Sequence, residues 1–160
     1  MPTVEEISKM IEQLYTMDRI ISAMQKKPHD YGGELLYANE AHTLKAIAQS
    51  EGISQAELSG QMFRTKGATS VVVDKLVEKG LVVRTREDGN QRRYLLTLTE
   101  RGWAVHQAHL AYDEAHAAWA AQHLGLSEAD LAGVNRSLEQ VIQFYSEHYL
   151  RSGQPVTPEV

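Results

Sequence analysis

The sequence predicts a mainly α-helical fold with one small β-hairpin, in which long helices from both chain ends flank a central module. Apolar residues recur at helical spacing along much of the 160-residue chain, which indicates amphipathic helices. The stretch Ser54–Thr99 reads as two short helices, then two strands around a tight turn. The chain has no cysteine and no run approaching the ~18 apolar residues of a membrane helix, so neither a disulfide framework nor a membrane span is expected.

Residues 1–36 are expected to form a long helix and a loop. Thr3 and Glu6 have the spacing of a capping box, so the helix should begin after Thr3 and run to Met24. Its apolar stripe is longer than a small central module can cover, so part of it should meet another surface. A proline and two glycines in Lys26–Leu36 favour a loop.

Residues 37–98 are expected to form the central module, beginning with three helices. Asn39 should cap the first of these. Ser54 should cap the second, with a glutamate three residues later completing a capping box. Thr65 should cap the third, and Gly80 should end it in the left-handed conformation that glycine adopts easily.

The hairpin follows directly. Leu81–Arg86 and Arg93–Thr97 read as strands, and Asp88-Gly89-Asn90 between them has strong turn chemistry. Two short helices followed by a hairpin describe a winged helix-turn-helix, a fold that places one helix against DNA.

Charge supports an interaction with a polyanion. Residues 64–93 contain eight Lys or Arg and four acidic residues, a balance of +4, whereas the whole chain carries −5 and the remainder therefore −9. One basic module in an acidic protein is the electrostatic footprint of nucleic-acid binding, so double-stranded DNA is the predicted partner.

Residues 99–150 are expected to form two further helices. One should span Glu100–His123 and be broken by Gly125, and the other should run from Ser127 to about Leu150. Residues 151–160 read as a flexible tail. The whole chain is thus predicted to be one domain whose terminal helices pair in a homodimer and place two recognition helices roughly 34 Å apart. The alternative is a monomer whose terminal helices fold back on each other.

Several stretches resemble the MarR family of bacterial regulators: Ser54-Gln-Ala-Glu-Leu-Ser, Asp74-Lys-Leu-Val-Glu-Lys-Gly-Leu-Val and Arg92-Arg-Tyr-Leu-Leu-Thr-Leu-Thr-Glu-Arg-Gly102. The resemblance implies a dimeric winged-helix repressor, or less often an activator, that binds pseudo-palindromic operators. The family wing usually has Asp two residues before its key Arg, whereas Asn90 precedes Arg92 here. Because Asn carries no charge, the ion pair at the wing tip is lost.

The candidate DNA contacts lie near the start of the recognition helix, where side chains reach base edges or phosphates, and on the wing. Arg92 should enter the minor groove or hold its phosphates. The other arginines are expected to contact phosphates, although an ordinary strand surface is an equally good interpretation for Arg84 and Arg86. The full predicted set is Arg64, Thr65, Lys66, Gly67, Thr69, Ser70, Lys75, Arg84, Arg86, Asn90, Arg92 and Arg93.

Histidines suggest an effector. His109 and Asp113 lie one helical turn apart, the spacing with which a helix offers two ligands to one metal. This pattern is similar to that of zinc-sensing MarR relatives, which use a His at the His42 position and two ligands on the long helix. That resemblance implies zinc bound by His42, His109 and Asp113, with Glu34, Glu40, His29 or Asp30 completing the shell.

Two alternatives remain for these histidines. They can be structural residues of a dimer interface, in which case no metal binds. The effector can instead be a phenolic or other aromatic anion, lined by Tyr31, Tyr37 and Trp103. Binding of either effector would change the spacing of the recognition helices and so modulate DNA affinity.

An enzyme is not expected. Serine and histidine are plentiful, but none forms a recognisable arrangement of nucleophile and general base, and Gly32-Gly33 lacks phosphate-loop spacing. The N-terminus is acidic and has no apolar signal region, so a soluble cytoplasmic protein is expected.

Overall fold

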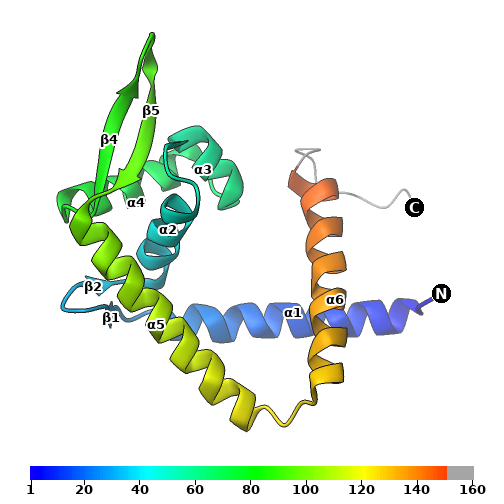
Figure 1. Cartoon of the computed structure of the whole chain (residues 1–160). Helices are drawn as coiled ribbons and strands as arrows, with labels where there is room; N and C mark the ends of the chain where they lie inside the picture. The colour runs from blue at the N-terminus through cyan, green and yellow to red at the C-terminus, as the bar shows by residue number, and fades with distance from the viewer. Residues whose placement is uncertain (151–160) are drawn as a thin grey trace. The chain divides into compact units, whose positions relative to one another are not determined.

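The computed structural model describes residues 1–150, apart from the side chains of residues 90–92 and 149–150 (Figure 1). Its helices and its small antiparallel sheet confirm the predicted fold class. The chain divides into two compact units, Met1–Ala111 and Tyr112–Val160. No helix among the described residues is long and apolar enough to cross a membrane. The predicted flexible tail, 151–160, lies outside the described residues.

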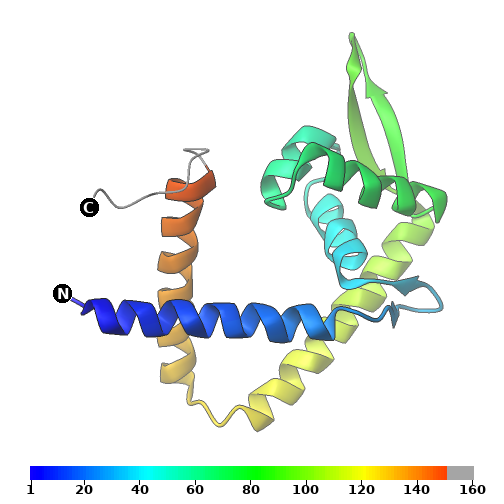
Figure 2. The same cartoon turned by 180° about the vertical axis from the view of Figure 1, so that it is seen from behind.

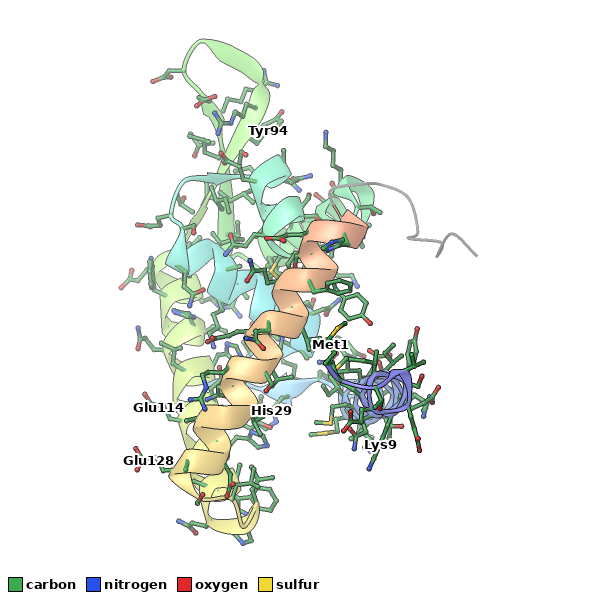
Figure 3. All side chains as sticks on the ribbon, turned by 90° about the vertical axis from the view of Figure 1, so that its right-hand side faces the viewer. Met1, Lys9, His29, Tyr94, Glu114 and Glu128 are labelled. Carbon is green, nitrogen blue, oxygen red and sulfur yellow. The ribbon has the colours of Figure 1, made fainter. Side chains whose placement is uncertain are left out.

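Helix α1 (Val4–Met24) begins where the sequence predicts. The Thr3 hydroxyl accepts a hydrogen bond from the amide of Glu6 at 3.2 Å, and the Glu6 carboxylate accepts one from the amide of Thr3 at 2.9 Å. This reciprocal capping box satisfies two amides that the helix itself cannot bond. Figure 3 looks along α1, whose side chains, including that of Lys9, radiate from the axis on every side. No residue of α1 is buried in the described chain.

The segment predicted as a loop contains a short hairpin of β1 (His29–Asp30) and β2 (Leu35–Leu36). The Asp30 carboxylate accepts a hydrogen bond from the amide of Gly33 at 2.6 Å and so closes the turn. Gly32 and Gly33 adopt φ angles of 69° and 90°, which only glycine reaches without strain. Strands of two residues are too short to show alternation, which explains why the sequence pattern missed them.

Helix α2 (Ala38–Gln49) is capped by Tyr37 and not, as predicted, by Asn39. The carboxylate of Glu40 accepts a hydrogen bond from the amide of Tyr37 at 2.8 Å, so the glutamate in the first turn satisfies this amide. The helix therefore begins earlier than the side-chain preferences indicated.

Helices α3 (Gln55–Gln61) and α4 (Lys66–Glu78) form the helix-turn-helix. Their predicted caps are confirmed: the hydroxyls of Ser54 and Thr65 each accept a hydrogen bond from an amide three residues later, at 3.2 Å. At the other end of α4, the predicted Gly80 has a φ of 70°.

The end of α4 is a Schellman motif. The amide of Gly80 donates to the carbonyl of Val77, and the amide of Leu81 donates to the carbonyl of Leu76, both at 2.9 Å. These bonds satisfy carbonyls that the helix leaves open and turn the chain sharply into the hairpin.

The wing consists of β4 (Val82–Glu87) and β5 (Asn90–Leu98), and β3 (Ile53–Ser54) adds a third strand. The order is β3-β5-β4, with Val82 paired to Leu98 at the base of the wing. Figure 2 shows the β4–β5 hairpin extending beyond the helices as a two-stranded arm. The buried core lies at the base of this arm, between α2, α3 and α4. Its fully buried side chains include Leu36, Leu44, Ile47, Leu58, Val73, Leu76, Leu81 and Leu96.

The wing leads into α5 (Glu100–His123) through a close contact. The Thr99 hydroxyl donates to the carbonyl of Gly80 at 2.7 Å and accepts from the amide of Gly102 at 2.9 Å. A Cβ on Gly102 would lie 3.0 Å from the carbonyl carbon of Leu81 and closer still to its oxygen. Only glycine therefore fits where the first turn of α5 meets the backbone of Leu81, just after α4.

The second unit contains the C-terminal half of α5 and helix α6 (Glu128–Tyr145). Gly125, with a φ of 67°, lies in the connection between α5 and α6, and Ser127 caps α6 as predicted. The α-helix stops at Tyr145 and not near Leu150, because a π-helical turn, Ser146–Leu150, follows it. No residue of α6 is buried in the described chain.

Candidate nucleic-acid interface

Helix α4 presents most of its predicted contact residues outwards. Lys66, Gly67 and Lys75 are exposed, and Ser70 is half-buried. Thr65 is exposed as well, but its hydroxyl caps the helix. Thr69 is fully buried and donates its hydroxyl to the carbonyl of Thr65 at 3.0 Å, which argues against its predicted role as a DNA contact.

Two predicted arginines bond to other parts of the module. The guanidinium of Arg64 donates to the hydroxyl of Thr43 at 2.8 Å and so ties the helix-turn-helix to α2. Arg84 forms an ion pair with Asp74 at 2.5 Å and donates to the side chain of Gln55 at 3.2 Å. Both arginines are half-buried, so the structure favours a role in holding the module together.

The wing offers other cations. The guanidinium of Arg86 lies 5.6 Å from the centre of the Tyr94 ring, within the range of a cation–π interaction, and remains exposed. Arg93 pairs with Glu57 at 3.0 Å and with Glu87 at 3.1 Å. Figure 3 shows Tyr94 on the hairpin. The predicted tip contacts, Asn90 and Arg92, have side chains outside the described residues.

The Glu57–Arg93 pair links α3 to β5. Hydrogen bonds from the hydroxyl and the amide of Ser54, and then from Arg93, lower the pKa of Glu57 to about 2. Glu57 is thus a carboxylate at any physiological pH, and Arg93 is already balanced by two acids. We therefore expect Arg93 to add little to the attraction of a polyanion.

Two exposed apolar residues of this surface escaped the sequence analysis. Val71 is 55% exposed on α4, and Phe63 is 61% exposed in the turn before α4. The helical wheel already separates Val71 from its buried neighbours Val72 and Val73, so this signal was available in the sequence. In contrast, no pattern in the sequence indicated the positive φ of Phe63, which is 52°.

The predicted histidine site is partly assembled. The ring centres of His42, on α2, and His109, on α5, lie 5.6 Å apart. Tyr31 packs edge-on against His109 with ring centres 5.0 Å apart, and His29 packs against Tyr31 at the same distance. His109 and Tyr31 are buried, whereas His42 and His29 are exposed.

Two of the predicted acidic ligands, Glu34 and Glu40, pair with cations and not with the histidines. Glu40 is buried and forms an ion pair with Lys79 at 3.2 Å. Glu34 pairs with Arg101 and lies 4.0 Å from Lys79. Because cations already neutralise both carboxylates, this arrangement argues against Glu34 and Glu40 as metal ligands. The described residues contain no group of three His, Cys, Asp or Glu side chains that could hold a metal ion, so the zinc site stays a prediction.

Together, the helix-turn-helix, the extended hairpin and the exposed cations of α4 and β4 define a winged helix-turn-helix protein. Residues 36–94, which span α2 to the middle of β5, match the model of the MarR family.

Comparison with individual proteins agrees. The chain is 36% identical over 62 residues to the HTH-type transcriptional regulator SarZ of Staphylococcus aureus, a match that spans 39% of this chain and 42% of SarZ. The structure of Streptococcus pneumoniae FabT in complex with DNA has a TM-score of 0.66 and 20% identity, covering 91% of this chain and 99% of FabT. Staphylococcus aureus MarR, solved in complex with salicylate and kanamycin, has a TM-score of 0.62 and 18% identity over 71% of this chain and 75% of that one.

These comparisons show similarity to the MarR family in part of the chain, residues 36–94. The structural matches establish the fold, and the match to the family model lies in the central module. Members of the matched family are transcriptional regulators and not enzymes, in agreement with the sequence analysis.

Proposed function

We propose that this chain is a transcriptional regulator, acting as a repressor, that binds duplex DNA through α4 and the β4–β5 wing. The observation that carries the proposal is the exposure of Lys66, Lys75 and Arg86 on the two elements that a winged helix-turn-helix presents to DNA. FabT, whose structure was solved in complex with DNA, has the same fold, which supports DNA as the partner of this chain.

The N-terminus of α4 adds to this attraction. The first turns of α1, α2, α3, α5 and α6 each contain an acidic residue, whereas the first turn of α4 has none. The partial positive charge of the helix dipole is therefore not neutralised there, and Lys66 reinforces it. Such an end suits a phosphate group, which would position α4 on the DNA without reading its sequence.

Salt should weaken DNA binding steeply. If the protein neutralises about six phosphates, its affinity should fall by about 10³-fold between 50 and 200 mM salt, because bound counterions are released. Lys66→Gln and Arg86→Gln should each lower affinity for all sequences alike and reduce the slope of log affinity against log salt by about 1 per half-site. Fluorescence anisotropy on an operator selected from a random DNA pool measures both quantities.

The matched control is Lys9→Gln on α1, which removes the same charge away from α4 and the wing. This variant should keep the slope of the wild type. Binding that does not depend on salt, or an equal loss of slope in Lys9→Gln, would contradict the proposed DNA surface.

We further propose that the protein is a homodimer, assembled through α1 and α6. Neither helix buries a side chain within the described chain. Both nevertheless carry an apolar face at helical spacing, and a water-exposed stripe of this length is typical of an interface. The exposed apolar residues include Ile7, Met17, Ile21 and Met24 on α1, and Leu131, Val134, Leu138 and Ile142 on α6.

For the effector, we propose a divalent metal such as zinc at the His42–His109 pair. Two imidazoles with ring centres 5.6 Å apart are close enough to share one ion, and Asp113 lies one turn from His109 on α5. The ion would bring together α2 of the DNA-reading module and the long helix α5, and so influence the spacing of the recognition helices.

Calorimetric zinc titration tests this proposal. His109→Ala and the exposed His42→Ala should each weaken zinc binding by about tenfold or more, and zinc should change operator affinity only when both histidines are present. The control is His123→Ala, whose ring stacks on Trp119 farther along α5. Unchanged zinc affinity in His109→Ala would contradict the metal proposal. Salicylate, tested in the same DNA assay, would then examine the aromatic-anion alternative, which the packing of Tyr31 on His109 supports.

A further inference from the structure

The outward face of α4 has an apolar centre. The buried residues Thr69, Val72, Val73 and Leu76 share one side of the helix. At 100° per residue, Gly67 and Val71 point about 170° and 150° away from the mean direction of that side. Gly67 has no side chain. Counted from the N-terminus of α4, the first side chain that points directly away from the buried side is therefore that of Val71, which is 55% exposed.

The same helix has few of the side chains that read base edges by paired hydrogen bonds. Guanine is read by Arg or Lys, and adenine by Asn or Gln. From Lys66 to Glu78 the sequence contains no Arg, Asn or Gln, and its only residues of this kind are Lys66 and Lys75. On the C-terminal half of α4, the exposed Glu78 would be repelled by phosphates, and the exposed Asp74 is paired with Arg84. Base reading therefore falls to the N-terminal half, where Ala68 is also exposed.

A second apolar side chain is held near the start of this half. Phe63 lies two residues before the cap of α4, and it is the one non-glycine residue with positive φ in the described chain. A bulky residue in this conformation is strained, and such strain concentrates at functional positions. The strained backbone presents a ring that is 61% exposed to solvent and that packing in this unit does not require.

Apolar side chains recognise one feature of the major groove, the C5-methyl group of thymine. We propose that α4 reads its operator through thymine methyl groups, with Val71 as the principal contact, Ala68 beside it and Phe63 as a second apolar contact. The proposal rests on the DNA binding proposed above and deepens it. It predicts operators with thymine at fixed positions of each half-site, contacted without a hydrogen bond to the base.

Replacing thymine by deoxyuridine tests this proposal in the unmodified protein, because uracil differs from thymine only by the missing methyl group. In the selected operator, each contacted thymine changed to deoxyuridine should weaken binding about fourfold, the factor expected for one buried methyl group. Deoxyuridine at thymines outside the half-sites should have no effect.

A variant locates the contact. In Val71→Ala, deoxyuridine at the position facing Val71 should no longer weaken binding, whereas the other thymine positions should keep their loss of affinity. Phe63→Asn, which relieves the backbone strain since Asn tolerates positive φ, should remove the penalty at a different position. The matched control is Val83→Ala, an exposed valine on β4 that should leave every penalty unchanged.

The outcomes separate this proposal from the proposed function. Salt-dependent binding that is equally tight for thymine and deoxyuridine operators would overturn methyl reading and leave DNA binding intact. A selected operator without conserved thymines in its half-sites would overturn it as well. Failure to bind any duplex would instead refute the proposed function itself.

Discussion

Gly102→Ala is expected to destabilise the folded chain by about 2–3 kcal/mol, although alanine is the better helix former. In an open helix the same change stabilises by about 1 kcal/mol. Here the added Cβ would overlap the carbonyl of Leu81 and lie 3.3 Å from the Cβ of Leu98. The obstacle is backbone, which cannot rotate away as a flexible side chain can, so overpacking outweighs the gain in helix propensity.

The affected contact connects three parts of the module. Leu81 follows the Schellman motif of α4, and its carbonyl accepts a hydrogen bond from the amide of Thr99 at 3.0 Å. Moving Leu81 to relieve the clash would disturb both the end of the recognition helix and the start of α5. We therefore expect weaker DNA binding as well as lower stability in this variant.

Urea unfolding followed by circular dichroism, at one fixed protein concentration, measures the change in free energy of unfolding. Gly60→Ala in α3 is the matched control, because a Cβ there meets nothing within 4 Å. The control should be stabilised by about 0.5–1 kcal/mol. Equal stability changes in the two variants would show that α5 does not approach Leu81 as closely as described.

Leu138→Asp is expected to weaken the homodimer by about 100-fold or more. Leu138 is 43% exposed in the single chain and lies between Val134 and Ile142 on the apolar face of α6. In a twofold dimer the change removes two leucine contacts, worth about 1.5 kcal/mol each, and places two carboxylates in an apolar interface. Sedimentation should then report the 17.9 kDa chain in place of a species of twice that mass.

DNA binding should fall together with the dimer. A pseudo-palindromic operator offers two half-sites, and a monomer can occupy them only one at a time, so it loses the gain from simultaneous binding. The wild-type protein and the variant are compared on the full operator and on a single half-site. The loss should be large on the full operator and small on the half-site.

Gln140→Asp controls for charge. At 100° per residue it lies about 160° from Leu138 on α6, and it is exposed. This variant should stay dimeric and keep its operator affinity. A wild-type protein that sediments as a monomer at working concentrations would refute the dimer directly.

Helix boundaries were predictable where short-range chemistry sets them. Capping residues such as Ser54 and Thr65 act on amides three residues away, so their effect is visible in the sequence. Asn39 failed as a cap because the carboxylate of Glu40 bonds to the amide of Tyr37 instead. The third strand, Ile53–Ser54, was missed because its pairing with Leu95 and Leu96 is distant in the sequence.

The candidate site was less predictable, because the partners of charged side chains come from remote segments. Arg84 bonds to Asp74 and Gln55, and Glu40 is paired with Lys79. From residue type alone, Arg84 could equally be a DNA contact, and Glu40 could equally be a metal ligand.

The sequence by itself determined the order of helices and strands, the basic balance of residues 64–93 and the apolar faces of the terminal helices, because periodicity, capping and charge are local properties. Only the tertiary structure decided which of the candidate residues remain exposed. It buries Thr69, commits Arg84 to Asp74, leaves Val71 facing solvent and brings His42 next to His109. These outcomes depend on how elements distant in the sequence pack together, and packing is a property of the folded chain as a whole.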